Sequence, residues 1–161
     1  VVAHFHYVMM GGTVVAFLGG LHYWWPKMWG RMYSEKWSRV SAALFFIGFN
    51  LTFIPQFILG SQGMPRRYWQ YDSFNDTGLF HLYHSISTVG SWIIALSFII
   101  MLVYLIHSLK YGKVAGSNPW GALTLEWQTP SPVPAHNFLK EPKITHGPYD
   151  YDKVDPERTI D

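Results

Sequence analysis

Two histidines near the start of the chain are the first residues that could do chemistry. His4 and His6 lie in the segment AHFHYV, separated by Phe5, and no Asp, Glu, Lys or Arg occurs before Lys27. Ionisable side chains inside an apolar membrane segment are costly and usually mark function. Helical residues two apart project about 200° apart, so this pair cannot easily share one metal. It can ligate two cofactors, one on each side of the helix. The alternative is two histidines that hydrogen-bond neighbouring helices.

A second group of candidate residues is the segment Gly63-Met64-Pro65-Arg66-Arg67, at the end of a later apolar stretch. Adjacent arginines at a membrane boundary can bind anionic lipid head groups. They can also hold carboxylates, because the guanidinium fork pairs with a carboxylate through two hydrogen bonds. Heme propionates are such carboxylates.

The remaining histidines of the apolar stretches form weaker patterns. His81 and His84 are three residues apart and could line one helix face as metal ligands, but no carboxylate or further histidine nearby completes a site. His22 and His107 lie near the ends of their stretches, as interfacial residues do. The chain has no cysteine, so any metal chemistry must use His, Met or carboxylate ligands. A formal net charge of +2 is too small to indicate nucleic acid binding.

Three windows without Asp, Glu, Lys or Arg must position these residues: 1–26, 40–65 and 77–109. Each exceeds the roughly 20 residues that a membrane-spanning helix requires. They predict an all-α integral membrane protein with three transmembrane helices. Residues 110–161 are polar and proline-rich and predict an extended tail without a stable fold of its own. The apolar run is already under way at Val1, so we expect a fragment, a processed product or one piece of a split subunit.

The basic residues predict the orientation of these helices. Lys27, Arg31, Lys36 and Arg39 lie between the first two windows, and further lysines follow the third. The positive-inside rule places this loop and the tail on the cytoplasmic or matrix side. The arginine pair then faces the opposite side, where the first helix begins with its two histidines.

Four segments together resemble the catalytic subunit (subunit I) of heme-copper terminal oxidases: AHFHYV, WWPKMWG, NLTFIPQFILGSQGMPRRY and NPWGALTLEWQTPSPVPAHNF. The resemblance implies helices ten to twelve of a twelve-helix bundle. It implies that His4 is the axial ligand of the high-spin heme that binds oxygen, and that His6 is an axial ligand of the low-spin heme. Phe5 then lies between the hemes, and Arg66 and Arg67 hold heme propionates.

The resemblance also implies a reaction and its partners. Oxygen is reduced to water with electrons from cytochrome c, coupled to proton translocation. The expected cofactors are two hemes, low-spin and high-spin and of type a, with copper whose ligands lie outside this chain. The expected partners are the remaining helices of the subunit and other oxidase subunits, including the copper-containing one where electrons enter. The expected location is a bacterial cell membrane, or alternatively the mitochondrial inner membrane.

Departures from the family pattern keep alternatives open. The family often has a histidine after the Pro-Gln pair of the second span, where this chain has Phe57. The similarity extends to about Tyr151 and does not include the copper ligands or the second ligand of the low-spin heme. The alternatives are a quinol oxidase of the same superfamily, a non-catalytic membrane module for heme binding or assembly, and a transporter without a cofactor.

Overall fold

The computed structural model describes residues 1–67, 69–70, 78–138 and 140–151. The first helical stretch consists of α1 (Val2–Met9), the π-helical turn η1 (Met10–Val14) and α2 (Val15–Trp29). Two long helices follow, α3 (Glu35–Ser61) and α4 (Leu79–Tyr111). A short 3-10 helix, η3 (Leu125–Gln128), lies in the tail.

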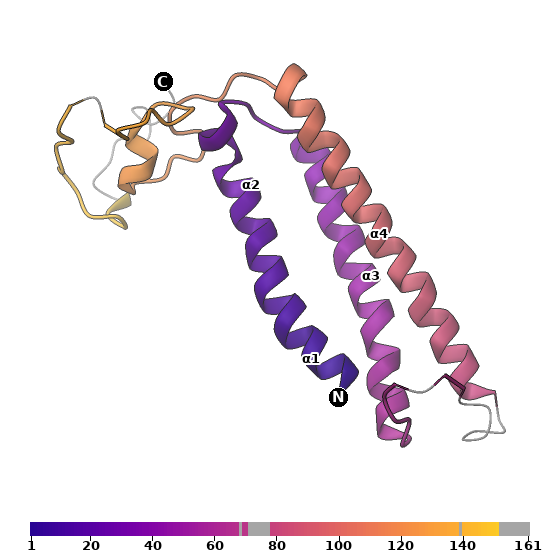
Figure 1. Cartoon of the computed structure of the whole chain (residues 1–161). Helices are drawn as coiled ribbons and strands as arrows, with labels where there is room; N and C mark the ends of the chain where they lie inside the picture. Colours follow the sequence, from indigo (N-terminus) through magenta and orange to yellow (C-terminus); the bar gives the residue numbers. More distant parts are fainter. Residues whose placement is uncertain (68, 71–77, 139, 152–161) are drawn as a thin grey trace. The chain divides into compact units, whose positions relative to one another are not determined.

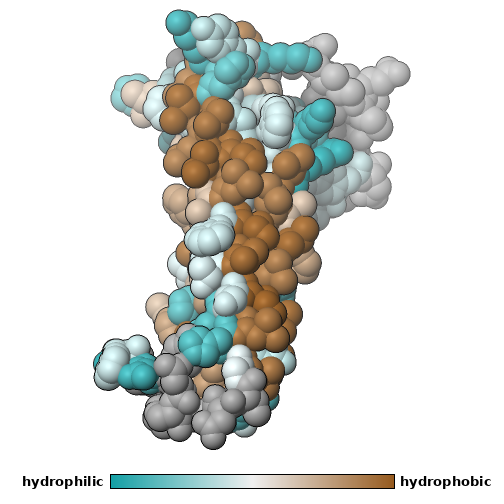
Figure 2. Space-filling view, turned by 90° about the vertical axis from the view of Figure 1, so that its right-hand side faces the viewer, coloured by the Kyte–Doolittle hydropathy of each residue, from teal (hydrophilic) through white to brown (hydrophobic). Residues whose placement is uncertain are grey.

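The architecture is all-α, as the sequence predicts. The stretches Val2–Trp29, Glu35–Ser61 and Leu79–Tyr111 contain 28, 27 and 33 residues and are long and apolar enough to cross a membrane. Apolar side chains cover much of the helical surface that Figure 2 displays. Exposed apolar residues of this number suit a lipid environment or further helices rather than water.

The chain divides into two compact units. The first contains Val1–Gly19 and Glu35–Tyr104, and the second contains Gly20–Ser34 and the chain from Leu105 onward. The first unit holds all the site residues that the sequence predicts. The second holds the end of α2, the end of α4 and the tail.

Small residues bring α3 and α4 together in the first unit, where the two helices run side by side in opposite directions (Figure 1). A Cβ atom added at Gly90 would lie 2.5 Å from the backbone nitrogen of Thr52, and one at Gly48 would lie 2.8 Å from that of Ile94. In a bilayer, this close approach provides the van der Waals contact that stabilises a helix pair. The absence of a side chain at Gly48 and Gly90 is therefore a packing requirement.

Serine side chains add hydrogen bonds between the same two helices. Ser41 Oγ donates to Ser97 O across 3.0 Å, and Ser97 Oγ donates to Ser41 O across 2.9 Å. Ser87 Oγ donates to Thr52 O across 2.8 Å and accepts from Gln56 Nε2 across 3.0 Å. These bonds determine the register of α3 on α4.

The tail packs against the end of α2 in the second unit. The indole of Trp127 is 1% exposed and donates to Tyr23 Oη across 2.8 Å. Lys27 is buried, and its Nζ donates to the backbone oxygens of Ser117, across 2.6 Å, and of Thr129. The tail therefore supplies the acceptors that allow a lysine to be buried in the last turns of α2.

Candidate functional site

His6 is held in one orientation by α1 and α3. Its Nδ1 lies 2.9 Å from the carbonyl oxygen of Val2, and its ring stacks on Phe53 with centroids 4.4 Å apart and 20° between the planes. A carbonyl oxygen only accepts hydrogen bonds, so Nδ1 carries the proton and the lone pair of a neutral imidazole lies on Nε2. This is the arrangement in which a histidine binds a metal through Nε2 while a neighbouring oxygen fixes its tautomer.

His4 lies in different surroundings from His6. Ala3 is 2% exposed and belongs to the core that α1 forms with Phe49 and Phe53 of α3, whereas His4 is exposed. The sequence predicts that the two histidines project in different directions, and the geometry places only His6 against α3. Phe5 is 41% exposed, and its ring centroid lies 4.1 Å from that of His6.

The α1–α3 contact includes one further polar bond. Tyr7 Oη donates to Asn50 Oδ1 across 2.8 Å. The Tyr7 ring also meets Phe49 edge-on, with centroids 4.8 Å apart. Because Tyr7 follows His6 directly, this bond helps to determine how α1 presents His6.

The end of α3 positions the two arginines. Met64 N donates to Leu59 O across 3.1 Å, and Gly63 N donates to Gly60 O across 3.2 Å. This pair of bonds, with Gly63 at φ +85°, is a Schellman motif that ends the helix in a left-handed residue. Pro65 follows and cannot continue the helix. The chain therefore turns sharply just before Arg66.

Arg67 has an uncommon backbone conformation. Its φ is +64°, in the left-handed region that non-glycine residues rarely occupy. Such a conformation costs on the order of 1 kcal/mol and is enriched at functional sites. Both Arg66 and Arg67 are exposed, which leaves their guanidinium groups accessible to a ligand.

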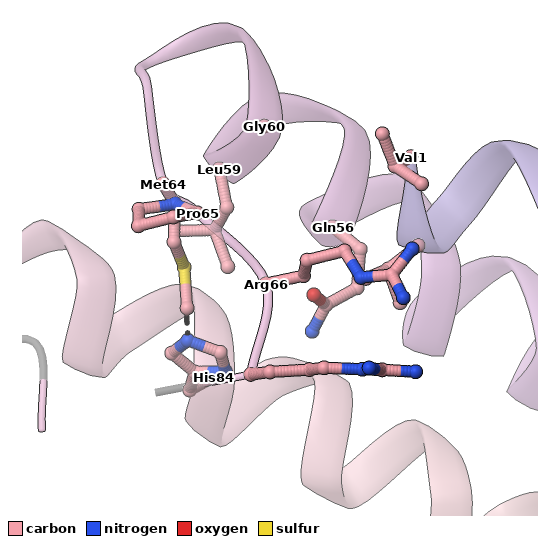
Figure 3. A pocket seen from close by; sticks show the side chains of 10 residues that line it. Val1, Gln56, Leu59, Gly60, Met64, Pro65, Arg66 and His84 are labelled. Carbon is pink, nitrogen blue, oxygen red and sulfur yellow. Dashed lines mark hydrogen bonds between the residues drawn. The ribbon is translucent and has the colours of Figure 1, made fainter. Parts of the chain in front are cut away.

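A cavity of about 520 Å³ lies beside the arginines, within the first unit (Figure 3). Residues of α1, of α3, of the following loop and of α4 line it. They are Val1, Val2, Gln56, Leu59, Gly60, Met64, Pro65, Arg66, Arg67 and His84. Its lining, drawn from the described part of the chain, contains two guanidinium groups, an imidazole and an amide but no carboxylate. Such a lining suits an anionic ligand.

The structure brings the arginine pair close to the start of the histidine helix, two segments that are far apart in the sequence. The arginine loop meets the start of α1, because Val1 and Val2 line the same cavity as Arg66 and Arg67. Reasoning from the sequence missed Gln56 and His84 as cavity residues. The sequence could have indicated His84, because His84 lies near the start of the third window, on the same predicted side of the membrane as the arginine pair.

The other histidines do not join this site. The ring of His22 meets Tyr33 edge-on at 5.1 Å, and the ring of His107 lies 4.9 Å from that of Tyr111. Within residues 1–67, 69–70, 78–138 and 140–151, no three His, Asp or Glu side chains gather as metal ligands would. The hemes that the resemblance implies need only one histidine per iron from this chain. The exposed His4 and the oriented His6 fit this need, and the cationic cavity fits the carboxylates of the propionates.

Comparisons with known proteins identify the family of the chain. Residues 1–93 match the family described as "Cytochrome C and Quinol oxidase polypeptide I". Cytochrome c oxidase subunit 1 of Thermostichus vulcanus is 46% identical over 152 residues, which cover 94% of this chain and 26% of that protein. The same subunit of Alkalihalophilus pseudofirmus is 41% identical over 162 residues, which cover 99% of this chain and 25% of that protein.

A third relative carries a different name. Heme-copper oxidase subunit I+III of Aeropyrum pernix is 46% identical over 144 residues, which cover 89% of this chain and 17% of that protein. The chain spans about a quarter of the length of the first two relatives. Since the family match covers residues 1–93 of 161, more than half of the chain, the chain belongs to the family of polypeptide I of cytochrome c and quinol oxidases.

Proposed function

We propose that this chain is the heme-ligating C-terminal part of a cytochrome c oxidase catalytic subunit, which reduces oxygen to water and couples the reaction to proton translocation. The observation that supports this most directly is the orientation of His6. Its Nδ1 proton is bound to Val2 O, and its ring is stacked on Phe53, so Nε2 is the nitrogen available to a metal. When bound, the hemes and copper supply the electron transfer and oxygen chemistry.

The two histidines have separate roles in this proposal. His6 binds the iron of the low-spin heme through Nε2, and the Val2 carbonyl makes the imidazole a stronger ligand by polarising the Nδ1–H bond. His4, which is exposed, would bind the iron of the high-spin heme, which supplies the oxygen chemistry when bound. Phe5, between them in sequence and 41% exposed, would contact the hemes that the two histidines hold.

Arg66 and Arg67 bind the propionates. Their cavity is cationic and adjoins the start of α1, where the histidine segment lies. Fixed positive charge near a heme stabilises the reduced form, which carries one more negative charge than the oxidised form. The two arginines therefore position the heme and raise its reduction potential.

Other parts of the oxidase complete this function. We place the copper ligands and the second ligand of the low-spin heme in the remaining helices of the same subunit. A copper-containing subunit passes the electrons of cytochrome c to the low-spin heme. The bacterial organisms of two relatives favour a bacterial cell membrane as the location.

A visible spectrum of the purified membrane complex tests the proposal. The dithionite-reduced complex is expected to show a low-spin heme band and a second heme band that shifts with carbon monoxide. His4→Ala should abolish the carbon monoxide shift, and His6→Ala should abolish the low-spin band. His81→Ala, an exposed histidine of α4, is the matched control and should leave both bands unchanged. A wild-type complex without heme would refute the assignment.

The electron donor separates the two branches of the family, whose description covers both cytochrome c and quinol oxidases. Oxygen consumption by the same complex, with reduced cytochrome c or with a quinol as the only donor, decides between them. Turnover with cytochrome c alone supports the proposal, and turnover with quinol alone assigns the chain to the other branch.

A further inference from the structure

We propose that a cavity at the end of α2 binds the head group of a zwitterionic membrane lipid, phosphatidylethanolamine, with the phosphate at Lys27 and the ammonium at Glu126. Every residue of this site lies in the second unit, apart from the proposed heme ligands and the arginine cavity. The tail, which the sequence predicts only as an extended segment, then has a role in holding a lipid at the membrane surface.

The cavity lies where the tail packs on α2. Its volume is about 320 Å³, at the lower end of the range of roughly 300 to 1,000 Å³ that is typical of small-molecule sites. Val133 N donates to Lys27 O across 3.2 Å and holds the tail against the helix. The lining from α2 includes Trp24 and Lys27, and the lining from the tail includes Glu126, Val133 and Phe138.

A buried ammonium group belongs to this lining. Lys27 is 4% exposed, and its Nζ donates to Ser117 O and Thr129 O and lies 5.2 Å from the ring centroid of Trp127. An ammonium group has three N–H bonds, and the described part of the chain supplies two oxygen acceptors. Both of these acceptors are uncharged. A phosphate in the cavity would provide the third acceptor and a compensating charge for the buried cation.

Glu126 gives the same cavity a negative charge. Its side chain is exposed and acts electrostatically on Lys27, but the two do not form an ion pair in the described part of the chain. The carboxylate would repel a simple anion, whereas it would attract a ligand that carries both signs of charge. A phosphoethanolamine group is such a ligand, because its phosphate accepts from Lys27 and its primary ammonium donates to Glu126.

The apolar part of the lining favours a lipid over a water-soluble zwitterion. Trp24 is 47% exposed and Val133 is 39% exposed, and Phe138 lines the cavity beside them. Trp24 lies near the end of the stretch Val2–Trp29, which is long and apolar enough to cross a membrane. Tryptophan is enriched where such helices meet the lipid head groups. The glycerol and first methylene groups of a lipid would cover these side chains, which a small soluble zwitterion would leave in water.

Photo-crosslinking of the purified complex tests the proposal. The probe is phosphatidylethanolamine with a diazirine near the start of one acyl chain, and the complex is reconstituted in a bilayer of phosphatidylcholine. Mass spectrometry of the digested complex is expected to find the label on peptides that contain Trp24 or Val133. Unlabelled phosphatidylethanolamine should displace the probe more effectively than phosphatidylglycerol, which has the phosphate but no ammonium group.

Variants of the cavity separate its charge from its shape. E126Q removes the partner of the ammonium and should reduce the labelling by about threefold, as expected for one exposed charge pair. E126K should reverse the preference in favour of phosphatidylglycerol. V133W fills the cavity without changing its charge and should also reduce the labelling. E141Q removes an exposed carboxylate of the tail outside the cavity and is the matched control.

The outcomes keep this proposal separate from the proposed function. Equal displacement by the two lipids would overturn the lipid site, because it would show only general contact of the tail with the bilayer. Unlabelled wild-type peptides, or unchanged labelling in E126Q or V133W, would overturn it as well. The visible spectrum is recorded for each sample, and both heme bands are expected in all of them. A complex without heme would refute the heme assignment and would leave the labelling result unaffected.

Discussion

His6 Nδ1 donates a hydrogen bond to the carbonyl oxygen of Val2 across 2.9 Å, and Val2 also lines the cavity of Arg66 and Arg67. One turn of α1 therefore joins the proposed iron ligand to the proposed propionate site. A shift of the arginine loop that moves Val2 would rotate the imidazole as well. This contact gives a physical reason for the ligand and the arginines to act together.

The stacking of His6 on Phe53 leads to the first prediction. Phe53→Leu keeps an apolar side chain but removes the aromatic face that orients the imidazole. We expect the complex to retain both hemes, with an altered electron paramagnetic resonance spectrum of the oxidised low-spin heme, because that spectrum reports ligand orientation. Phe46→Leu is the control, since Phe46 lies on the same helix but is 70% exposed. An unchanged spectrum in Phe53→Leu would show that stacking does not orient the ligand.

Arg67 provides a prediction about potential. Arg67→Gln removes one positive charge from the cavity, so the midpoint potential of the low-spin heme should fall, by an amount equivalent to on the order of 1 kcal/mol in the free energy of reduction. Arg67→Lys keeps the charge but loses the paired hydrogen bonds, so the potential should fall less in this variant. Redox titration measures both variants. Arg39→Gln, which breaks an exposed pair with Glu35, should leave the potential unchanged.

The turn that ends α3 provides a prediction about stability. Gly63→Ala should destabilise the complex by about 1 kcal/mol, because alanine tolerates a positive φ poorly. Gly19→Ala, within α2 and outside the cavity, is the control and should be neutral or slightly stabilising. A Cβ atom at either position meets nothing within 4 Å, so the comparison tests the positive φ of Gly63. Thermal loss of heme absorbance compares them, and equal stabilities would contradict a role for the left-handed residue.

The α3–α4 contact predicts a larger effect at Gly90. Gly90→Ala should destabilise the complex by about 1 to 3 kcal/mol, because its Cβ would lie 2.5 Å from Thr52 N and force the helices apart. Thermal unfolding of the purified complex measures this loss. Gly19→Ala serves as the control, because a Cβ atom there meets nothing within 4 Å. If Gly90→Ala is as stable as the wild type, the two helices are not as close as described.

The buried ammonium group of Lys27 leads to a prediction about the stability of the tail. Lys27→Met keeps the length of the side chain but leaves the carbonyl oxygens of Ser117 and Thr129 without their ammonium donor. We expect a loss of about 1 to 3 kcal/mol and faster hydrogen exchange near residues 117–129. Mass spectrometry of exchanged peptides measures this change. Lys36→Met, at an exposed position, should exchange like the wild type.

The sequence by itself determined the helices and the candidate ligands, because both depend on local properties. Long windows without charge predict membrane helices, and the two-residue spacing of His4 and His6 predicts different projections on any helix. The absence of charge placed the end of the second window at Pro65, whereas α3 ends at Ser61 in the turn at Gly63. It placed the end of the first window at Pro26, whereas α2 continues to Trp29. Lys27 can lie within this helix because the tail satisfies its ammonium group.

Only the tertiary structure decided which side chains share the cavity. His84 contacts Met64 and lines the cavity of the arginines because Gly48 and Gly90 allow α3 and α4 to approach closely, and serine bonds determine their register. Hydropathy is nearly unchanged when one apolar helix slides or rotates on another, so it cannot specify such a register. The tautomer of His6 likewise depends on an oxygen one turn away, and its ring orientation depends on Phe53 of another helix. Contacts between distant segments are set by packing, which the pattern of any single segment does not contain.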